Sequence, residues 1–343
     1  MLTRHSGRAL LALAALHTLT ACSDSELAGP VAAPLETIAL VELAGTRPAL
    51  YIQKSDGSSR TRIRFNGAAD QVPGNSPLVP ALTDANILAL RSVKWSPDGT
   101  RLAFVATVAP DQAEVVVMKA DGSDVRIVSP NYAYVVSDVD WSPDGTRVAY
   151  VMATRPLLQG LELFVSELTA TPRVTQVTTN SGYRGLGGTI RFAATGNALW
   201  ISQVTAEQGA PLFEKVGAVR RVDLATGAIA TVSENLVGEV QAVSRSGGWA
   251  IVLRRKSIAG SVYESRLVHV PLVATGLERV IVDGGQLDFA HLTTDDGRVV
   301  LMRAGPNGTD GRTFVTLEPN GGAELSIRGS GAEPLSADVR RRR

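Results

Sequence analysis

Six consecutive residues, Trp-Ser-Pro-Asp-Gly-Thr, occur twice in this chain of 343 residues, at 95–100 and again at 141–146. In both copies a valine lies two places before the tryptophan, and an arginine followed by apolar residues comes after the threonine. The two copies are 46 residues apart. A unit of this length cannot bury its own apolar face and must stack against further copies of itself. The period fits one four-stranded blade of a β-propeller.

The repeated hexapeptide predicts a tight turn between two strands. Proline presets φ, the aspartate side chain accepts hydrogen bonds from nearby amides, and glycine takes the positive φ. Weaker copies follow in the sequence, and their aligned turn glycines are spaced by 46, 51, 51 and 50 residues: Gly99, Gly145, Gly196, Gly247 and Gly297. A second hairpin follows each turn, as in 115–128 around Asp121-Gly122. These units predict five complete blades.

The N-terminal part of the chain predicts a sixth blade that lacks its inner strand. Residues 38–43, 50–54 and 60–65 are expected to form its three outer strands, and 334–339 near the C-terminus is expected to supply the fourth. A ring closed by a strand from the other end of the chain leaves no long open edge. The predicted fold is therefore all-β, a six-bladed β-propeller of four-stranded antiparallel blades over residues 36–340, closed by a C-terminal strand that joins the N-terminal blade.

With these WD-like Trp-Ser-Pro-Asp-Gly repeats, the chain resembles the TolB-type propellers. The resemblance covers about residues 36–340 and is strongest in the second and third blades. The family includes the periplasmic TolB component, propellers attached to prolyl-oligopeptidase-type peptidases, and anchored lipoproteins. This sequence has neither the N-terminal α/β domain of TolB nor a hydrolase domain, so the resemblance implies the fold and no particular role.

The first 22 residues predict a secreted protein. Arg4 and Arg8 precede an apolar run, and small residues follow it, as in a signal peptide. The run is too short to cross a bilayer, which needs about 20 apolar residues. Leu19-Thr-Ala-Cys22 resembles the lipobox of bacterial lipoproteins, and this implies lipidation of Cys22, the single cysteine of the chain. The alternative is an ordinary signal peptide with an incidental cysteine. We predict a lipoprotein signal peptide at 1–21 and a flexible tether at 22–35.

Charge argues against a nucleic-acid partner. The chain has 34 Lys and Arg and 33 Asp and Glu residues, and removal of 1–21, which holds Arg4 and Arg8 and no acid, leaves 32 basic against 33 acidic side chains. A near-neutral chain without a basic stripe is not typical of proteins that bind nucleic acid. We expect no nucleic-acid partner, no cofactor and a monomer. Membrane contact is expected through the N-terminal lipid only.

Propeller topology predicts one face for binding. The connections between the second and third strands of a blade, and those between blades, emerge on the same face, and the longest irregular segments, 66–90 and 254–261 among them, fall there. Long loops on a rigid scaffold commonly carry binding sites, and aromatic and arginine side chains commonly anchor them. The candidate binding residues on this long-loop face are Tyr132, Tyr134, Tyr183, Arg184, Phe213, Arg254, Arg255 and Lys256.

The repeat motif also contains residues that could suggest a site. We expect Trp95 and Trp141 to pack between blades, with a binding role as the alternative. Asp98 and Asp144 recur in turns, so a structural role is favoured over acid–base chemistry or calcium binding. Asp138 and Asp140 precede Trp141, and Asp140 is expected to face the central channel by strand alternation, with a cation bound there as the alternative. Asp295 and Asp296 fall at a turn.

Catalytic motifs are scarce. The sequence has no Gly-x-Ser-x-Gly elbow and no His-Glu-x-x-His, and His269 and His291 are the only histidines after residue 21. His291 lies on a predicted inner strand and is the better catalytic candidate of the two. We therefore expect neither catalytic nor metal-binding residues.

Three functional hypotheses remain, one of which, a purely structural or vestigial lipoprotein, no sequence feature excludes. The first is a non-catalytic lipoprotein that binds a protein or cell-envelope polymer through its long-loop face, in the periplasm and anchored to the outer membrane. The alternative is an envelope hydrolase or lyase with its active site in the central channel. Converging ionisable groups with perturbed pKa values in the channel would favour the enzyme.

Overall fold

The structure is a computed structural model. It describes residues 36–66, 70–71, 82–110, 112–130, 133–154, 161–169, 173–179, 189–205, 216–259, 262–273, 276–304, 311–322, 324–327, 329 and 334–340. Within these ranges no helix is long and apolar enough to span a membrane. The predicted signal peptide and tether, with Cys22, lie outside the described residues.

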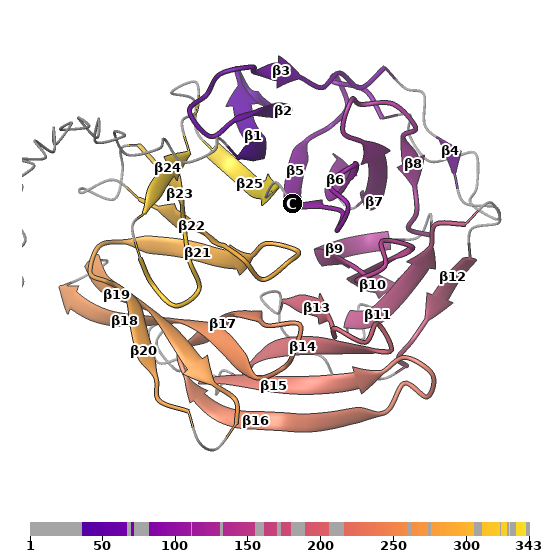
Figure 1. Cartoon of the computed structure of the whole chain (residues 1–343). Coiled ribbons are helices and arrows are strands. Elements are labelled where there is room, and N and C mark those ends of the chain that lie inside the picture. The colour runs from indigo at the N-terminus through magenta and orange to yellow at the C-terminus, as the bar shows by residue number, and fades with distance from the viewer. Residues whose placement is uncertain are drawn as a thin grey trace, which may run out of the picture. The chain divides into compact units, whose positions relative to one another are not determined.

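Six antiparallel sheets form a ring around a central axis (Figure 1). From the axis outward, the first three contain β25 (Pro334–Arg340), β1 (Thr37–Ala44), β2 (Arg47–Lys54) and β3 (Thr61–Arg62) in blade 1; β5 (Ala89–Trp95), β6 (Arg101–Ala109), β7 (Gln112–Lys119) and β8 (Arg126–Ile127) in blade 2; and β9 (Ala133–Trp141), β10 (Arg147–Thr154), β11 (Leu161–Glu167) and β12 (Arg173–Gln176) in blade 3.

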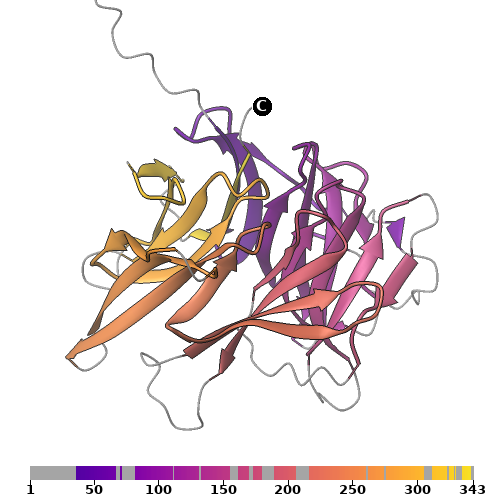
Figure 2. The same ribbon diagram turned by 60° about the horizontal axis from the view of Figure 1, so that its bottom comes forward.

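The other three blades repeat this order from the axis outward. They contain β13 (Ile190–Phe192), β14 (Ala198–Thr205), β15 (Val216–Asp223) and β16 (Ile229–Val237) in blade 4; β17 (Glu239–Val243), β18 (Trp249–Ala259), β19 (Val262–Pro271) and β20 (Arg279–Asp283) in blade 5; and β21 (Leu287–Leu292), β22 (Val299–Arg303), β23 (Thr313–Leu317) and β24 (Leu325–Ile327) in blade 6. Figure 2 shows the same ring in a tilted view.

The ring closes as the sequence predicts. β25 pairs antiparallel with β1, with Leu40 opposite Ala337 and Ile38 opposite Val339. The C-terminal strand is thus the inner strand of the N-terminal blade, and the six-bladed fold is confirmed.

The core is divided among the interfaces between blades. The described residues form six apolar clusters, and each cluster joins residues of two neighbouring blades. Both repeated tryptophans are buried there, and their indole nitrogens donate to the backbone of the preceding blade: Trp141 Nε1 to Lys94 O at 3.1 Å and Trp95 Nε1 to Asp338 O at 3.3 Å. The packing role expected for Trp95 and Trp141 is confirmed.

The repeated turn is stabilised by its aspartate. Asp98 accepts hydrogen bonds from the Ser96 hydroxyl at 2.6 Å and the Thr100 amide at 3.0 Å. Asp144 accepts the same bonds in blade 3. Burial raises the pKa of Asp98, but the hydrogen bonds from Ser96 and Thr100 outweigh it and hold the pKa below its ordinary value. The two repeated aspartates are structural.

In blade 6 the expected alignment is wrong by one residue. In the turn of blade 2, the Gly99 amide donates to the carbonyl three residues earlier. In the turn of blade 6, the Asp296 amide makes this bond, and Asp296, rather than Gly297, has the positive φ, at 58°. Asp295 therefore occupies the position of Asp98 and accepts from Thr293 Oγ1 at 2.7 Å. Asp296 replaces the turn glycine, which aspartate can do because it tolerates the left-handed conformation.

Two expected loops contain strands. Of the segment 254–261, expected to be irregular, the described part, 254–259, belongs to β18 and extends the hairpin with β19, in which Arg254 pairs with Arg266 and Lys256 with Glu264. In the segment before blade 2, β4 (Asp70–Gln71) pairs parallel with β8 and adds a fifth, outermost strand to that sheet. The pattern of turn residues did not predict either of these strand segments, because each lies outside the part of the blade that repeats along the chain.

Candidate functional site

The turn of blade 6 reaches across the axis of the ring. The chain between β21 and β22 extends toward the centre in Figure 1. Thr294 Oγ1 donates to Trp95 O of blade 2 at 2.6 Å, and Asp296 Oδ2 accepts from the Arg245 amide of blade 5 at 2.6 Å. A single turn thus contacts blades on different sides of the axis.

Two buried arginines add to these cross-axis contacts. Arg245 of blade 5 donates through Nη2 to Trp141 O of blade 3 at 2.9 Å and through Nη1 to Phe192 O of blade 4 at 3.3 Å. Arg191 of blade 4 donates to Leu292 O of blade 6 at 3.1 Å and to the Asp296 carboxylate. The planar guanidinium suits this role because it presents five donors in a fixed geometry.

Asp140 is the carboxylate between these two arginines. It is 1% exposed, and its oxygens lie 3.5 Å from the Arg191 and Arg245 guanidinium nitrogens. Its Oδ2 also accepts from the Phe192 amide at 2.8 Å. The expectation that Asp140 faces the channel agrees with this position, and the cations that it meets are arginine side chains. Among the described residues, no group of three or more His, Cys, Asp or Glu is arranged to hold a metal ion.

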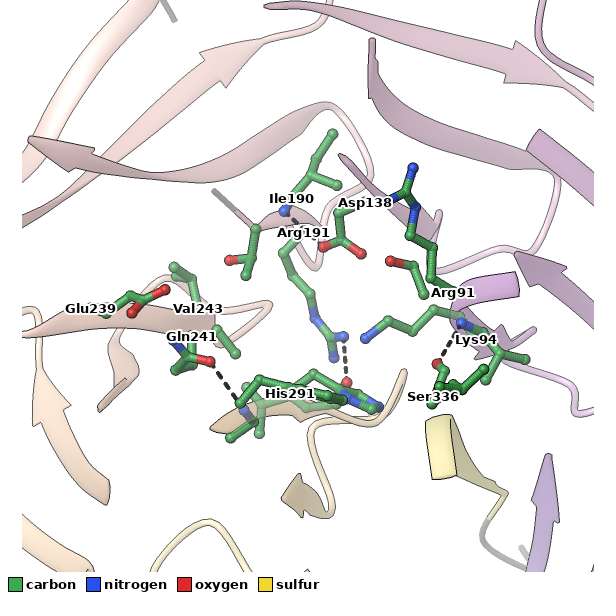
Figure 3. Close-up of a pocket in the computed structure, with 18 residues that line it drawn as sticks. Arg91, Lys94, Asp138, Ile190, Arg191, Glu239, Gln241, Val243, His291 and Ser336 are labelled. Carbon is green, nitrogen blue, oxygen red and sulfur yellow. Dashed lines mark hydrogen bonds between the residues drawn. The ribbon is translucent and has the colours of Figure 1, made fainter. Parts of the chain in front are cut away.

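A cavity of about 290 Å³ lies on the side of this network where the inner strands begin (Figure 3). Lys94 and Arg191 extend into it from opposite sides, and Asp138, Gln241, His291 and Ser336 line it as well. Its wall also includes Val93, Ile190, Val243, Phe289 and Leu335. The site therefore combines charged groups with an apolar wall.

β-Bulges shape the cavity. At the level of the cavity, the inner strands β5, β9, β17, β21 and β25 each have one extra residue relative to the strand paired with them, and β9 has a second one nearer its start. In β5 the bulge lies between Arg91 and Lys94, where Ser92 has a φ of 52°. Bulges redirect side chains, and residues in sparsely populated backbone conformations cluster at functional sites. In β5 this irregularity immediately precedes Lys94.

Inter-blade hydrogen bonds hold several lining residues in place. Asp138 Oδ2 accepts from the Ile190 amide at 3.2 Å, Gln241 Oε1 from the Ala290 amide at 3.0 Å, and Ser336 Oγ from the Val93 amide at 3.2 Å. Each bond joins the inner strand of one blade to that of the next. These side chains are therefore oriented by the fold.

The ionisable groups of the cavity have shifted pKa values. Burial lowers the pKa of the Lys94 ammonium, although the charges of Asp138 and Asp338 oppose the shift. Burial raises the pKa of Asp138, with Lys94 opposing. Burial and the Lys94 charge lower the pKa of His291 to about 4. His291 Nε2 lies 3.5 Å from Asp338 Oδ1, beyond a normal hydrogen bond. Ionisable groups with shifted pKa values therefore converge here.

The opposite end of the axis has a second hollow of about 470 Å³. It is lined by the repeated turn of blade 2, by Arg245 and by Arg340. The Arg340 guanidinium lies 5.7 Å from the centre of the Trp95 ring. This hollow is separated in the fold from the cavity of Lys94, because it lies where the inner strands end.

The candidate binding residues taken from the sequence are only partly described by the structure. Tyr132, Tyr183, Arg184 and Phe213 lie outside the described residues, and Tyr134 lies on β9 with no description of its side chain.

Arg254, Arg255 and Lys256 lie together on β18. Arg254 forms two 2.9 Å hydrogen bonds with Glu278, and Arg255 forms one of 2.9 Å with Glu239, a residue that lines the cavity. Lys256 is exposed. Because β17 begins at Glu239 opposite Leu253, these three residues extend past the start of the inner strand, on the face where the cavity lies.

Sequence reasoning missed most of the charged network. One position of the inner strand supplies most of these charges. It is the residue just before the last residue of the strand, or the equivalent of that position in β25, and it holds Lys94, Asp140, Arg191, His291 and Asp338. The turn glycines recur along the chain, whereas the residue type at this neighbouring position varies among the blades, so the repeat pattern does not mark it. Arg245 lies at a turn position where the other repeats have no arginine, so the repeat pattern does not identify it.

No protein-family model matches the chain, and no curated protein sequence matches it. Solved structures do. TolB from Acinetobacter baumannii has a TM-score of 0.61 at 14% identity, over 89% of this chain and 66% of that one. A chain of the nidogen–laminin complex has a TM-score of 0.57 at 5% identity, over 89% and 98%. A putative TolB from Agrobacterium tumefaciens has a TM-score of 0.51 at 14% identity, over 90% and 99%.

These similarities establish the fold and nothing beyond it, because the identities are low. The chain covers 66% of the length of the Acinetobacter TolB. The protein has the fold of a TolB-like six-bladed β-propeller.

Proposed function

We propose that this six-bladed propeller is a lipid-anchored protein of the bacterial cell envelope that binds a protein or an envelope polymer and performs no chemistry of its own. The anchor is Cys22, the location is the outer membrane on its periplasmic side, and the protein is a monomer. Two of the structures with this fold are TolB chains and a third comes from a complex between two proteins, which supports an interaction role.

The observation that carries the proposal is the contact network across the ring axis. Arg191, Arg245 and the turn of blade 6 each bond to a blade that is not their neighbour in the ring. These contacts fill part of the axis, which leaves the faces of the ring as the surface for a large partner. On the face with the cavity, the hairpin of β18 and β19 extends past the inner strands and carries Lys256. Rigid strands that project a basic side chain are a suitable docking element.

Photocrosslinking in intact cells tests the binding face. A photoreactive residue at Lys256 or Tyr183 is expected to capture a defined partner. The control is the same residue at Ser123, an exposed position in the turn between β7 and β8 on the opposite face. Equal capture of the same species from Ser123 would contradict the choice of face.

Metabolic labelling tests the anchor. Cells that express the wild-type chain are expected to incorporate labelled palmitate into it and to keep it in the membrane fraction. The Cys22→Ser variant is expected to lose the label and to appear in the periplasmic fraction, because anchoring of this kind depends on the acyl chains. An unlabelled wild-type chain would overturn lipidation and leave the binding proposal to the crosslinking experiment.

One observation favours the alternative, an envelope hydrolase or lyase with its site in the channel. Lys94, Asp138 and His291 converge on the cavity and have shifted pKa values, as active-site groups commonly do. In the described part of the chain, however, no serine or threonine hydroxyl is hydrogen-bonded to His291. Turnover of an envelope polymer by the wild-type protein, lost in Lys94→Met, would establish the enzyme.

A further inference from the structure

Two opposite charges face the cavity without meeting. Lys94 of blade 2 and Asp138 of blade 3 both line it. Among the neighbouring charges, that of Asp138 opposes the pKa shift of Lys94 most strongly, and that of Lys94 opposes the pKa shift of Asp138 most strongly. Among the described residues the two side chains form no ion pair, and the Lys94 ammonium donates no hydrogen bond, although Lys94 is only 6% exposed. A buried charge without a partner is costly, so a group that bridges the two would be stabilised there.

Further donors lie beside this gap. Gln241 uses its Oε1 to accept from the Ala290 amide, so its NH2 group remains a donor. Ser336 accepts from the Val93 amide through Oγ, so its hydroxyl proton can be donated. Figure 3 shows Ser336 close to the base of Lys94 and Asp138 on another side of the cavity. Donors and an acceptor are thus presented by different blades.

The size and wall of the cavity limit what could bridge the charges. A volume of about 290 Å³ suits a small molecule. A simple anion would pair with Lys94 but face Asp138, and a simple cation would do the reverse. A molecule that carries both charges satisfies both residues, and its apolar part can pack against Val93, Ile190 and Phe289.

We propose that the channel cavity binds a small zwitterion of the α-amino acid class, with its carboxylate on Lys94 and its ammonium on Asp138. Its side chain contacts the apolar wall of the cavity. This binding needs no macromolecular partner, so it is independent of the function proposed above, and either can fail without the other.

Calorimetry on the full-length protein in detergent tests the proposal with three probes, L-leucine, L-valine and L-phenylalanine. At least one is expected to bind with a Kd below about 1 mM. The matched controls for leucine are 4-methylpentanoate and 3-methylbutylamine, which each carry one of the two charges and are expected to bind at least about tenfold more weakly. If none of the three amino acids binds, or if 4-methylpentanoate binds as tightly as leucine, the proposal is wrong.

Two variants test the assigned contacts. Lys94→Met and Asp138→Asn are each expected to weaken binding of the tightest probe by about tenfold or more, because each removes one hydrogen-bonded charge. Lys119→Met, at an exposed position of the same blade, is the control and is expected to leave the Kd unchanged. Wild-type affinity in either cavity variant would overturn the assignment.

A measurement on the wild-type protein keeps the test valid if a variant does not fold. Acetic anhydride modifies accessible amines, and mass spectrometry follows each lysine separately. A saturating amount of the bound amino acid is expected to slow modification of Lys94 at least threefold and to leave Lys119 unaffected. Equal protection of both lysines, or of neither, would contradict the proposal.

Discussion

At the scale of single residues, the centre of the ring depends on charges that are buried and matched. Asp140 has two arginines and one amide around it, and Asp338 accepts from the Trp95 amide at 2.7 Å in the corresponding position of blade 1. Such groups are stabilising only while each has its partners. Loss of one member is therefore expected to cost more than loss of an exposed ion pair.

Asp140→Ala tests this difference. The variant leaves Arg191 and Arg245 without their shared carboxylate and the Phe192 amide without its acceptor, so we expect the free energy of unfolding to fall by about 3–5 kcal/mol. Urea denaturation measures it. Asp283→Ala, which breaks the exposed pair with Arg266, is the control, with an expected loss below about 1 kcal/mol. Similar losses in both variants would contradict the buried network.

His291 predicts a dependence of stability on pH. Its pKa is lowered to about 4 in the folded chain, against 6.5 for the exposed group, and the charges that face it are Lys94, Arg191 and Asp338. Between these pH values the unfolded chain binds more protons, so the free energy of unfolding falls as the pH drops from 6.5 to 4 and is fully retained above 6.5.

The expected contribution of His291 is roughly 3 kcal/mol, from a shift of about 2.5 pH units at 1.36 kcal/mol each. Between pH 7 and pH 4, the free energy of unfolding is expected to fall less in His291→Gln than in the wild type, by about this amount. Urea denaturation at each pH measures the difference. His269→Gln is the comparison: burial also lowers the pKa of His269, but this ring is only partly buried, against Trp249 on β19, so we expect a smaller change. An unchanged pH dependence in His291→Gln would show that the group is not buried as a neutral base.

At the scale of elements, the turn between the first two strands is the repeated unit of the fold. Four of its copies place a glycine at a φ between 67° and 72°. Their surroundings differ: a Cβ at Gly145 would lie 3.6 Å from Pro97, whereas a Cβ at Gly247 would clash with the indole ring of Trp200. One backbone conformation therefore occurs in two steric environments.

A pair of substitutions separates these two effects. Gly145→Ala is expected to destabilise the fold by about 1–2 kcal/mol, the cost of the left-handed conformation for a residue with a Cβ. Gly247→Ala has the same cost and must also displace Trp200, whose Nε1 donates to Arg245 O at 3.0 Å. We expect the thermal midpoint of Gly247→Ala to be clearly the lower of the two. Equal midpoints would mean that Trp200 moves freely.

At the scale of the whole molecule, the strand from the C-terminus makes the ring continuous. β25 covers the inner edge of β1, and its Ser336 and Asp338 accept from the Val93 and Trp95 amides of blade 2. Without it, β1 would present an unpaired edge, which favours aggregation. Blade 2 would lose these hydrogen bonds as well.

Truncation tests the closure. A chain that ends at residue 333 is expected to elute from size exclusion as aggregate and to lose its cooperative thermal transition. A synthetic peptide of residues 334–343, added during refolding, is expected to restore part of the monomer, whereas a scrambled peptide of the same composition is not. A truncated chain with the wild-type midpoint would show that closure by β25 is dispensable.

The sequence alone determined the architecture, because a turn of fixed chemistry repeated at one period requires stacked copies, and the unmatched strands at the two ends have only each other as partners. It also predicted the burial of Trp95 and Trp141 and the turn role of Asp98, since these follow from local chemistry. Only the tertiary structure decided which charges meet at the axis. Four blades supply these charges, through Lys94, Asp138, Arg191 and Arg245. The inner strands β5, β9 and β17, which position all of them except Arg191, contain bulges that the repeat pattern does not reveal. Contacts across a ring depend on closure and register, which no local pattern of residues specifies.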